Sequence, residues 1–152
     1  MSIAETATES NVPHKAPFNV KNVSRVLEVA PAPARAALEH FSRKLEFETD
    51  CADVFASFVS QRVDFVLVDV RSEKLFLRSH VPGAINIPVL NMTAGRLEEY
   101  SPETVFVVYC AGPHCNGSNK AEIRIAGMGR PVKEMIGGVT GWLDEGFTLE
   151  EA

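Results

Sequence analysis

The chain has 152 residues, of which 45% are hydrophobic and 23% charged, and its formal net charge is −5. These values predict one soluble globular domain with a sizeable core and room for a short extension. Lysine and arginine form no dense run, which disfavours nucleic acid and anionic membranes as partners. Three cysteines suit no secreted disulfide scaffold, and we find neither a leader pattern nor an apolar run approaching ~20 residues. We therefore expect a cytoplasmic protein in a reducing compartment.

The N-terminal part of the chain differs in pattern from the rest. Residues 1–20 are polar, contain proline and show no periodicity, which is typical of a disordered tail. Residues 21–44 predict a helical extension, in which apolar residues recur at helical spacing after Pro33. We expect this extension to pack on its own domain. The alternative is a homodimer contact through the N-terminal helices.

Strands and helices alternate over residues 45–152, which predicts an α/β domain. Strands are expected at 45–48, 64–70, 84–87, 104–110 and 131–136, and helices after Asp50, at 73–79, near Leu97, after Ser118 and after Gly138. This order favours a roughly five-stranded, mostly parallel sheet with helices on both faces. Ligands of such sheets bind beyond the carboxyl ends of the strands. Three of these ends carry notable chemistry: Asp69 with Arg71, Cys110 with its loop, and Gly137 with Gly138.

Cys110 is the candidate catalytic nucleophile. It ends the most apolar strand-like run of the chain, and a loop and a helical pattern follow it directly. Backbone amides and the helix dipole favour an anion at such a position, and the thiolate is the reactive form of cysteine. The candidate substrate-binding loop comprises Ala111, Gly112, Pro113, His114, Cys115, Asn116, Gly117 and Ser118. We expect Ser118 to cap the next helix and to point its hydroxyl at the pocket. The alternative for Cys110 is a buried, unreactive thiol.

Four segments resemble the rhodanese-like family of sulfurtransferases. They are residues 65–71, 80–88, 107–110 and 137–142, which occur in the family's order and at about its spacing, so the resemblance covers roughly 45–150. It implies a single-domain enzyme of the thiosulfate sulfurtransferase type. The Cys110 thiolate would take the sulfane sulfur from a small sulfur-containing anion such as thiosulfate, forming a persulfide. The sulfur would then pass to cyanide, a small thiol or a protein thiol. No cofactor is implied.

The loop departs from this family at its arginine. The common loop carries arginine where this chain has Cys115, and phosphatase-type relatives carry it where this chain has Asn116. A phosphate clamp needs a bidentate arginine, so phosphatase activity is disfavoured. His114 or Lys120 could supply positive charge to the site, although neither offers the planar fork of arginine.

Several alternatives stay open at this point. Cys115 is either a resolving thiol that attacks a persulfide or sulfenate on Cys110, or a residue without chemistry. Together with His114, the two cysteines are too few for a closed zinc site, so no metal is expected. Asp69 and Arg71 are expected to form a structural pair, from which Arg71 could lend positive potential to the site.

Two further functions compete with sulfur transfer. One is a non-catalytic binding or regulatory module that kept the fold, which the missing loop arginine and the N-terminal helices suggest. The other is a dithiol redox switch between Cys110 and Cys115.

Overall fold

The computed structural model describes residues 23–151, so the predicted tail at 1–20 lies outside the described residues. The helices are α1 (Ala34–Phe47), α2 (Cys51–Val59), α3 (Glu73–Arg78), α4 (Ala94–Leu97), α5 (Gly117–Gly127) and α6 (Gly138–Asp144), with short 3-10 turns η2 (Arg25–Leu27) and η3 (Val89–Asn91). The strands are β1 (Glu48–Thr49), β2 (Phe65–Asp69), β3 (Ile85–Asn86), β4 (Val105–Tyr109) and β5 (Val132–Met135). In this described part, no helix combines the length and the apolar character needed to cross a bilayer.

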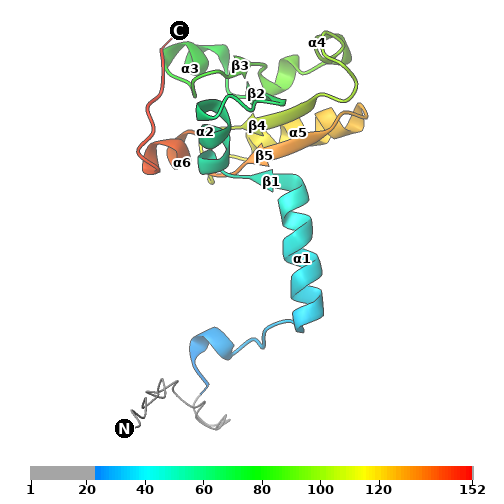
Figure 1. The fold of residues 1–152 in the computed structure, drawn as a ribbon, viewed down its shortest axis with the longest axis vertical. Coiled ribbons are helices and arrows are strands. Elements are labelled where there is room, and N and C mark those ends of the chain that lie inside the picture. The colour runs from blue at the N-terminus through cyan, green and yellow to red at the C-terminus, as the bar shows by residue number, and fades with distance from the viewer. Residues whose placement is uncertain (1–22, 152) are drawn as a thin grey trace, which may run out of the picture.

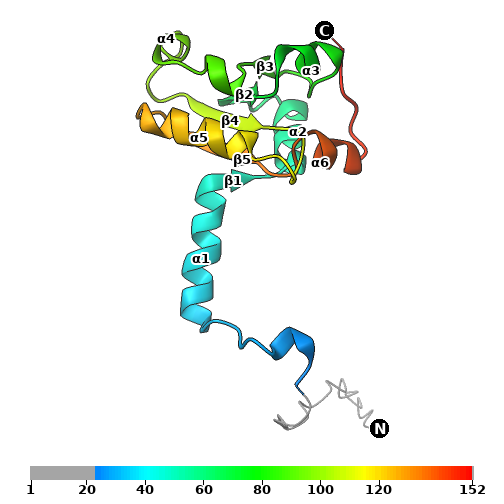
Figure 2. The same ribbon diagram turned by 180° about the vertical axis from the view of Figure 1, so that it is seen from behind.

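The strands form one parallel sheet in the order β1-β5-β4-β2-β3. The pair β2 and β4 is the longest, from Phe65 opposite Val105 to Asp69 opposite Tyr109. Helices cover both faces, with α2 on one side and α5 on the other (Figures 1 and 2). The predicted α/β class is therefore confirmed. Because all strands run the same way, their carboxyl ends meet at one edge of the sheet.

A separate apolar core lies on each face of the sheet, because successive strand residues point to opposite sides. In β4, Val107 and Tyr109 face α2 and α6, whereas Phe106 and Val108 face α4 and α5. The α2 and α6 side is completed by Cys51, Val54, Leu67, Val81, Met135 and Trp142. The other side is completed by Val68, Val70, Ile87, Met92, Leu97, Cys110, Ala121 and Ile125. These two cores hold the strand ends, and with them the loop after β4, in fixed positions.

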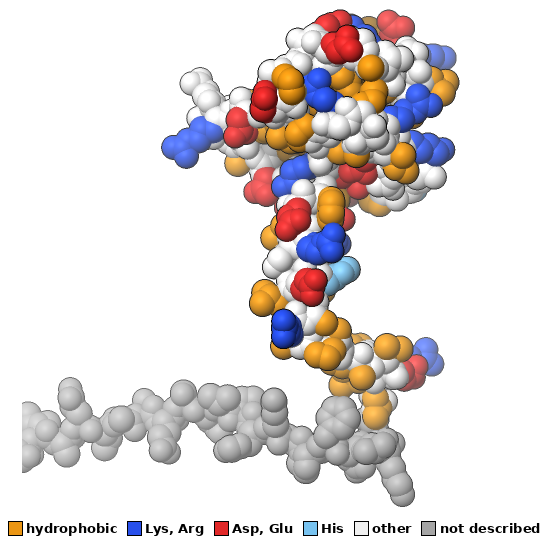
Figure 3. Space-filling model, turned by 90° about the vertical axis from the view of Figure 1, so that its right-hand side faces the viewer, with side chains coloured by type: hydrophobic (Ala, Val, Ile, Leu, Met, Phe, Trp, Pro, Cys, Tyr) orange, Lys and Arg blue, Asp and Glu red, His pale blue; other side chains and the backbone are white. Residues whose placement is uncertain are grey.

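Helix α1 projects away from the domain as a stalk (Figure 1). None of its residues is buried, and hydrophobic side chains lie exposed along it (Figure 3). The prediction that this extension packs on its own domain is therefore wrong. The predicted strand at 45–48 is also wrong at its start, because α1 continues to Phe47, where a Lys44–Glu48 ion pair of 3.4 Å supports its last turn.

A homodimer through the N-terminal helices remains a prediction. The exposed apolar face of α1 makes it testable. Leu38, Phe41 and Leu45 follow one another on one face and are 70%, 62% and 71% exposed. A lone helix of this length is marginal in water, so we expect the face to pair with a second copy of the chain. Light scattering should give a dimer for the native chain and a monomer for Phe41→Glu. Arg43→Glu, on the opposite face, is the control and should stay dimeric; a native chain that is monomeric at every concentration would contradict the prediction.

Candidate active site at the end of β4

Cys110 lies directly after β4, at the carboxyl edge of the sheet, and is 7% exposed. Its carbonyl oxygen accepts a hydrogen bond from the Val139 amide at 3.1 Å. The next carbonyl, of Ala111, accepts from the amide and the hydroxyl of Thr140, both at 3.0 Å. The first turn of α6 therefore fixes the start of the loop. Sequence reasoning missed Thr140, although it lies in the 137–142 segment that carried the family resemblance.

Two glycines let other elements approach Cys110 closely. Gly138, at the start of α6, has a φ of +56°, and a Cβ there would overlap the carbonyl oxygen of Cys110 and lie 3.0 Å from the Gly112 amide nitrogen. Gly117 begins α5, and a Cβ there would lie 2.8 Å from Cys110 Sγ and 3.4 Å from Cys115 Sγ. Both sulfur atoms therefore lie against the first residue of α5, where the helix dipole and the free amides of the first turn favour a thiolate.

The loop turns back so that Cys115 meets Cys110. The Cys115 amide donates to the Gly112 carbonyl at 2.9 Å, which closes a turn with Pro113 and His114 at its centre. A disulfide joins Cys110 to Cys115, with Cα atoms 6.3 Å apart, a spacing within the usual range for disulfides. The second loop thiol therefore lies within bonding reach of the candidate nucleophile.

A pocket of about 540 Å³ opens over this loop, between the ends of β4 and β5 and the starts of α2 and α6. Among the predicted site residues, Cys110, Gly112, Pro113, Cys115 and Ser118 line it. Ala111, His114 and Asn116 instead line a second pocket of about 440 Å³, which also touches Pro113 and Cys115. Lys120 is exposed and borders neither of these pockets, so it is not placed to replace the missing arginine.

The charge of the larger pocket is negative. Asp50, Glu134 and Glu145 line it, and its lining contains no lysine, arginine or histidine among the described residues. Ser118 is buried, and its hydroxyl donates to Glu134 Oε1. The prediction that Ser118 caps α5 is therefore wrong, and Asn116 occupies the cap position. Sequence reasoning missed all three carboxylates, because they come from separate elements that only the topology brings together.

Cys51 is the third cysteine and also lines this pocket. It is buried at 3% exposure, and its Sγ donates weakly to the carbonyl of Ile136 at 3.5 Å. Burial, together with the charges of Asp50 and Glu145, raises the pKa of Cys51 to about 11. It is therefore a neutral thiol near neutral pH and a poor nucleophile.

We expect Cys51 to resist alkylation in the folded protein. With a pKa of about 11, roughly one Cys51 in a thousand is a thiolate at pH 8. Iodoacetamide should therefore label two thiols of the reduced, folded chain and three after unfolding, counted by intact mass. Three rapid labels on the folded chain would contradict this. Because folding raises this pKa from 9.0, its contribution to stability is present below pH 9.0 and is lost as the pH rises toward 11.

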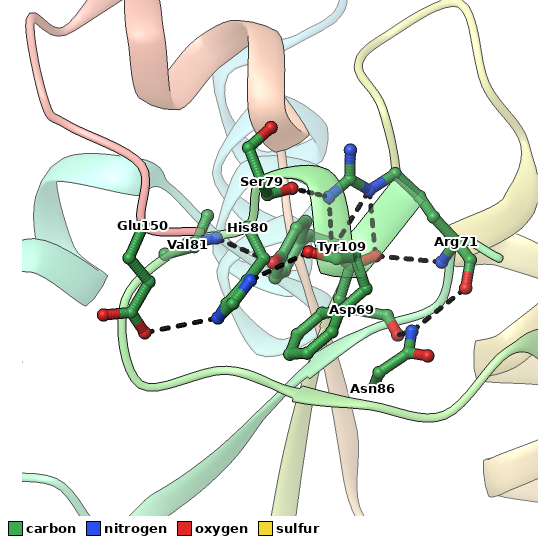
Figure 4. Close-up of polar contacts among 9 residues, drawn as sticks. Asp69, Arg71, Ser79, His80, Val81, Asn86, Tyr109 and Glu150 are labelled. Atoms are coloured by element: carbon green, nitrogen blue, oxygen red, sulfur yellow. Dashed lines mark hydrogen bonds and ion pairs between the residues drawn. The ribbon is translucent and has the colours of Figure 1, made fainter. Parts of the chain in front are cut away.

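Asp69 and Arg71 form the predicted structural pair (Figure 4). The Arg71 guanidinium donates to Asp69 through Nε at 3.0 Å and through Nη2 at 2.6 Å, and Nη2 also donates to the Ser79 carbonyl at 2.7 Å. Burial alone would lower the pKa of Arg71, but the hydrogen bonds and the charge of Asp69 outweigh it and raise this pKa. Neither side chain lines the pocket over Cys110, so the pair holds the strand end rather than the site.

Further polar contacts beside this pair anchor Tyr109, the residue before Cys110. The Val81 amide donates to the hydroxyl of Tyr109 at 3.0 Å, and burial raises the pKa of Tyr109. Next to it, His80 Nδ1 donates to the Phe76 carbonyl at 2.9 Å, and His80 Nε2 lies 3.2 Å from Glu150 (Figure 4). His80 therefore holds the turn that follows α3.

Comparison with known proteins agrees with this geometry. The family model described as "Rhodanese-like domain" matches residues 55–145. Because this match covers more than half of the chain, the chain belongs to the rhodanese-like domain family.

The most informative relatives are longer proteins or solved structures of the same fold. The chain is 38% identical over 89 residues to the HTH-type transcriptional regulator Rv0324 of Mycobacterium tuberculosis, covering 58% of this chain and 38% of the regulator. It is 33% identical over 101 residues to the adenylyltransferase and sulfurtransferase UBA4 of Candida albicans, and the match covers 60% of this chain and 22% of UBA4. The chain thus spans well under half the length of these curated relatives. The crystal structure of the BH2092 protein of Bacillus halodurans matches with a TM-score of 0.75 and 35% sequence identity. The match covers 78% of this chain and 87% of that protein's chain.

Proposed function

We propose that the chain is a sulfurtransferase that carries a sulfane sulfur as a persulfide on Cys110. The observation that supports this most is the position of Cys110, which lies at the end of β4 and lines a pocket, with its sulfur against the first residue of α5. Membership of the rhodanese-like family and the sulfurtransferase activity in the name of UBA4 agree with the proposal.

The proposed reaction has two halves. The Cys110 thiolate attacks the sulfane sulfur of the donor, the donor's remaining part leaves with the bonding electron pair, and a Cys110 persulfide remains. A thiol, a protein thiol or cyanide then attacks the outer sulfur and restores the thiolate. The free amides of the first turn of α5 stabilise the thiolate and the persulfide anion. Thr140 holds the start of the loop that carries Cys110.

Intact mass of the reduced Cys115→Ser chain after incubation with thiosulfate or an organic persulfide tests this function, because this variant lacks the loop thiol that is joined to Cys110 in the structure. Gain of one sulfur atom, lost on treatment with cyanide and absent in Cys110→Ser, is the expected result. Cys51→Ser shows whether any remaining gain comes from the buried thiol. If no donor of either kind adds sulfur to the reduced Cys115→Ser chain, the non-catalytic module becomes the better account of this protein.

The pocket charge predicts which donor class reacts faster. Three carboxylates around the pocket repel the thiosulfate dianion more strongly than an organic persulfide, whose charge is at most −1. We expect Glu134→Gln to raise kcat/KM for thiosulfate by about two- to five-fold and to raise it by less for the organic persulfide. Glu99→Gln, on the exposed Arg96–Glu99 pair, is the matched control. Equal effects of Glu134→Gln on both donors would argue against a charge effect.

A dithiol redox switch is the second candidate function, which the Cys110–Cys115 disulfide favours. It predicts a reversible loss of two thiols on mild oxidation, with Cys51 untouched. A chain that shows this loss but takes up no sulfur would be a switch rather than a transferase. Failure of Cys115 to pair under any oxidant would exclude the switch.

A further inference from the structure

We propose that Cys115 is an internal acceptor of the reaction, so that the chain releases the carried sulfur as hydrosulfide and ends as a Cys110–Cys115 disulfide. This inference rests on the proposed persulfide of Cys110 and adds a product and a reductant class to it. It makes the chain a reductive sulfur-releasing enzyme, whose turnover consumes an external thiol.

The first support is the contact between the two thiols. Their sulfur atoms are joined in the structure, and the turn closed by the Cys115 amide and the Gly112 carbonyl holds them together. Because both atoms lie against Gly117, the same helix N-terminus favours a thiolate on either one. Cys115 is therefore positioned to attack a group on Cys110 without movement of the surrounding elements.

The second support is the difference in exposure between the two cysteines. Cys110 is buried, whereas Cys115 is half-buried and also faces the second pocket. A reductant arriving from solvent thus reaches Cys115 more easily than Cys110. Attack on Cys115 releases Cys110 as the leaving thiolate, which is the form needed for the next sulfur uptake.

The proposed step balances in atoms and electrons. The Cys115 thiolate attacks Sγ of the Cys110 persulfide, the bond between that Sγ and the outer sulfur breaks, and hydrosulfide leaves with the electron pair. The two cysteine thiols are oxidised to a disulfide, and the sulfane sulfur is reduced to sulfide. An external dithiol, or two equivalents of a small thiol, then reduces the disulfide by exchange and restores both thiols.

A single-turnover experiment without external thiol tests this step. The reduced chain is freed of reductant and given an excess of thiosulfate, from which sulfite leaves when the persulfide forms, and hydrosulfide and intact mass are measured together. The native chain should release about one hydrosulfide per chain and lose two hydrogen atoms, as a disulfide requires. Cys115→Ser should instead keep the added sulfur, and it should release hydrosulfide only after a dithiol is added. Cys110→Ser should do neither.

The outcomes separate this inference from the proposed function. A native chain that keeps the added sulfur as stably as Cys115→Ser overturns the internal acceptor, while the persulfide function stands. A native chain and Cys115→Ser that both fail to react with thiosulfate or with an organic persulfide overturn both. Native chain oxidised beforehand to the disulfide should take up no sulfur, and uptake by it would show that Cys110 is not the carrier.

Discussion

Gly138→Ala is expected to destabilise the fold by at least about 2 kcal/mol and to reduce sulfur loading of the protein that still folds. A side chain at position 138 destabilises the fold in two ways. The φ of +56° at Gly138 disfavours a Cβ, and that Cβ would overlap the carbonyl oxygen of Cys110. Relief requires α6 to separate from the loop, which shifts the position of Cys110. Thermal denaturation and the fraction of persulfide formed measure the two effects.

Gly127→Ala is the matched control for this prediction. Gly127 ends α5, and a Cβ there would meet no atom within 4 Å. Alanine favours helix over glycine by roughly 0.5–1 kcal/mol, so this variant should be as stable as the native chain or slightly more stable. If Gly138→Ala melts at the temperature of Gly127→Ala, the contact between α6 and the loop does not contribute to stability.

The fold followed from the sequence where a pattern was long and apolar. The β2 and β4 runs are rich in valine and nearly unbroken, which predicts buried parallel strands. The pattern was too short at residues 45–48, where an alternation of four residues does not distinguish a strand from the last turn of a helix. The packing of α1 was also predicted wrongly, because an apolar stripe tells that a helix needs a partner but not which surface supplies it.

The site was predictable as far as it is local in sequence. Cys110 was assigned because a strand, a loop and a helix follow one another along the chain, and the structure places it at that junction. The partner of Ser118 was not predictable in this way, since Glu134 comes from β5 and faces α5 only in the folded sheet. The negative charge of the pocket is likewise a property of the tertiary structure, and it bears directly on the donor class of the proposed reaction.

The Asp69–Arg71 pair supplies the second large effect, because both partners are removed from water. Their side chains are 0% and 7% exposed, and Asp69 also accepts a hydrogen bond from the Arg71 amide at 2.9 Å. Burying two charges costs free energy that only their mutual contacts offset. Removing one partner therefore leaves the other charge buried and nearly uncompensated.

Asp69→Ala should lower the free energy of unfolding by about 3–5 kcal/mol, because Arg71 keeps only the Ser79 carbonyl as an acceptor. The double variant Asp69→Leu with Arg71→Met should recover more than half of this loss, since two apolar side chains need no compensation. Glu99→Ala, which breaks an exposed pair, should cost less than about 1 kcal/mol. Urea denaturation of the three variants measures these differences. A double variant no more stable than Asp69→Ala would show that the loss comes from packing and backbone contacts at Asp69 rather than from an unpaired buried charge.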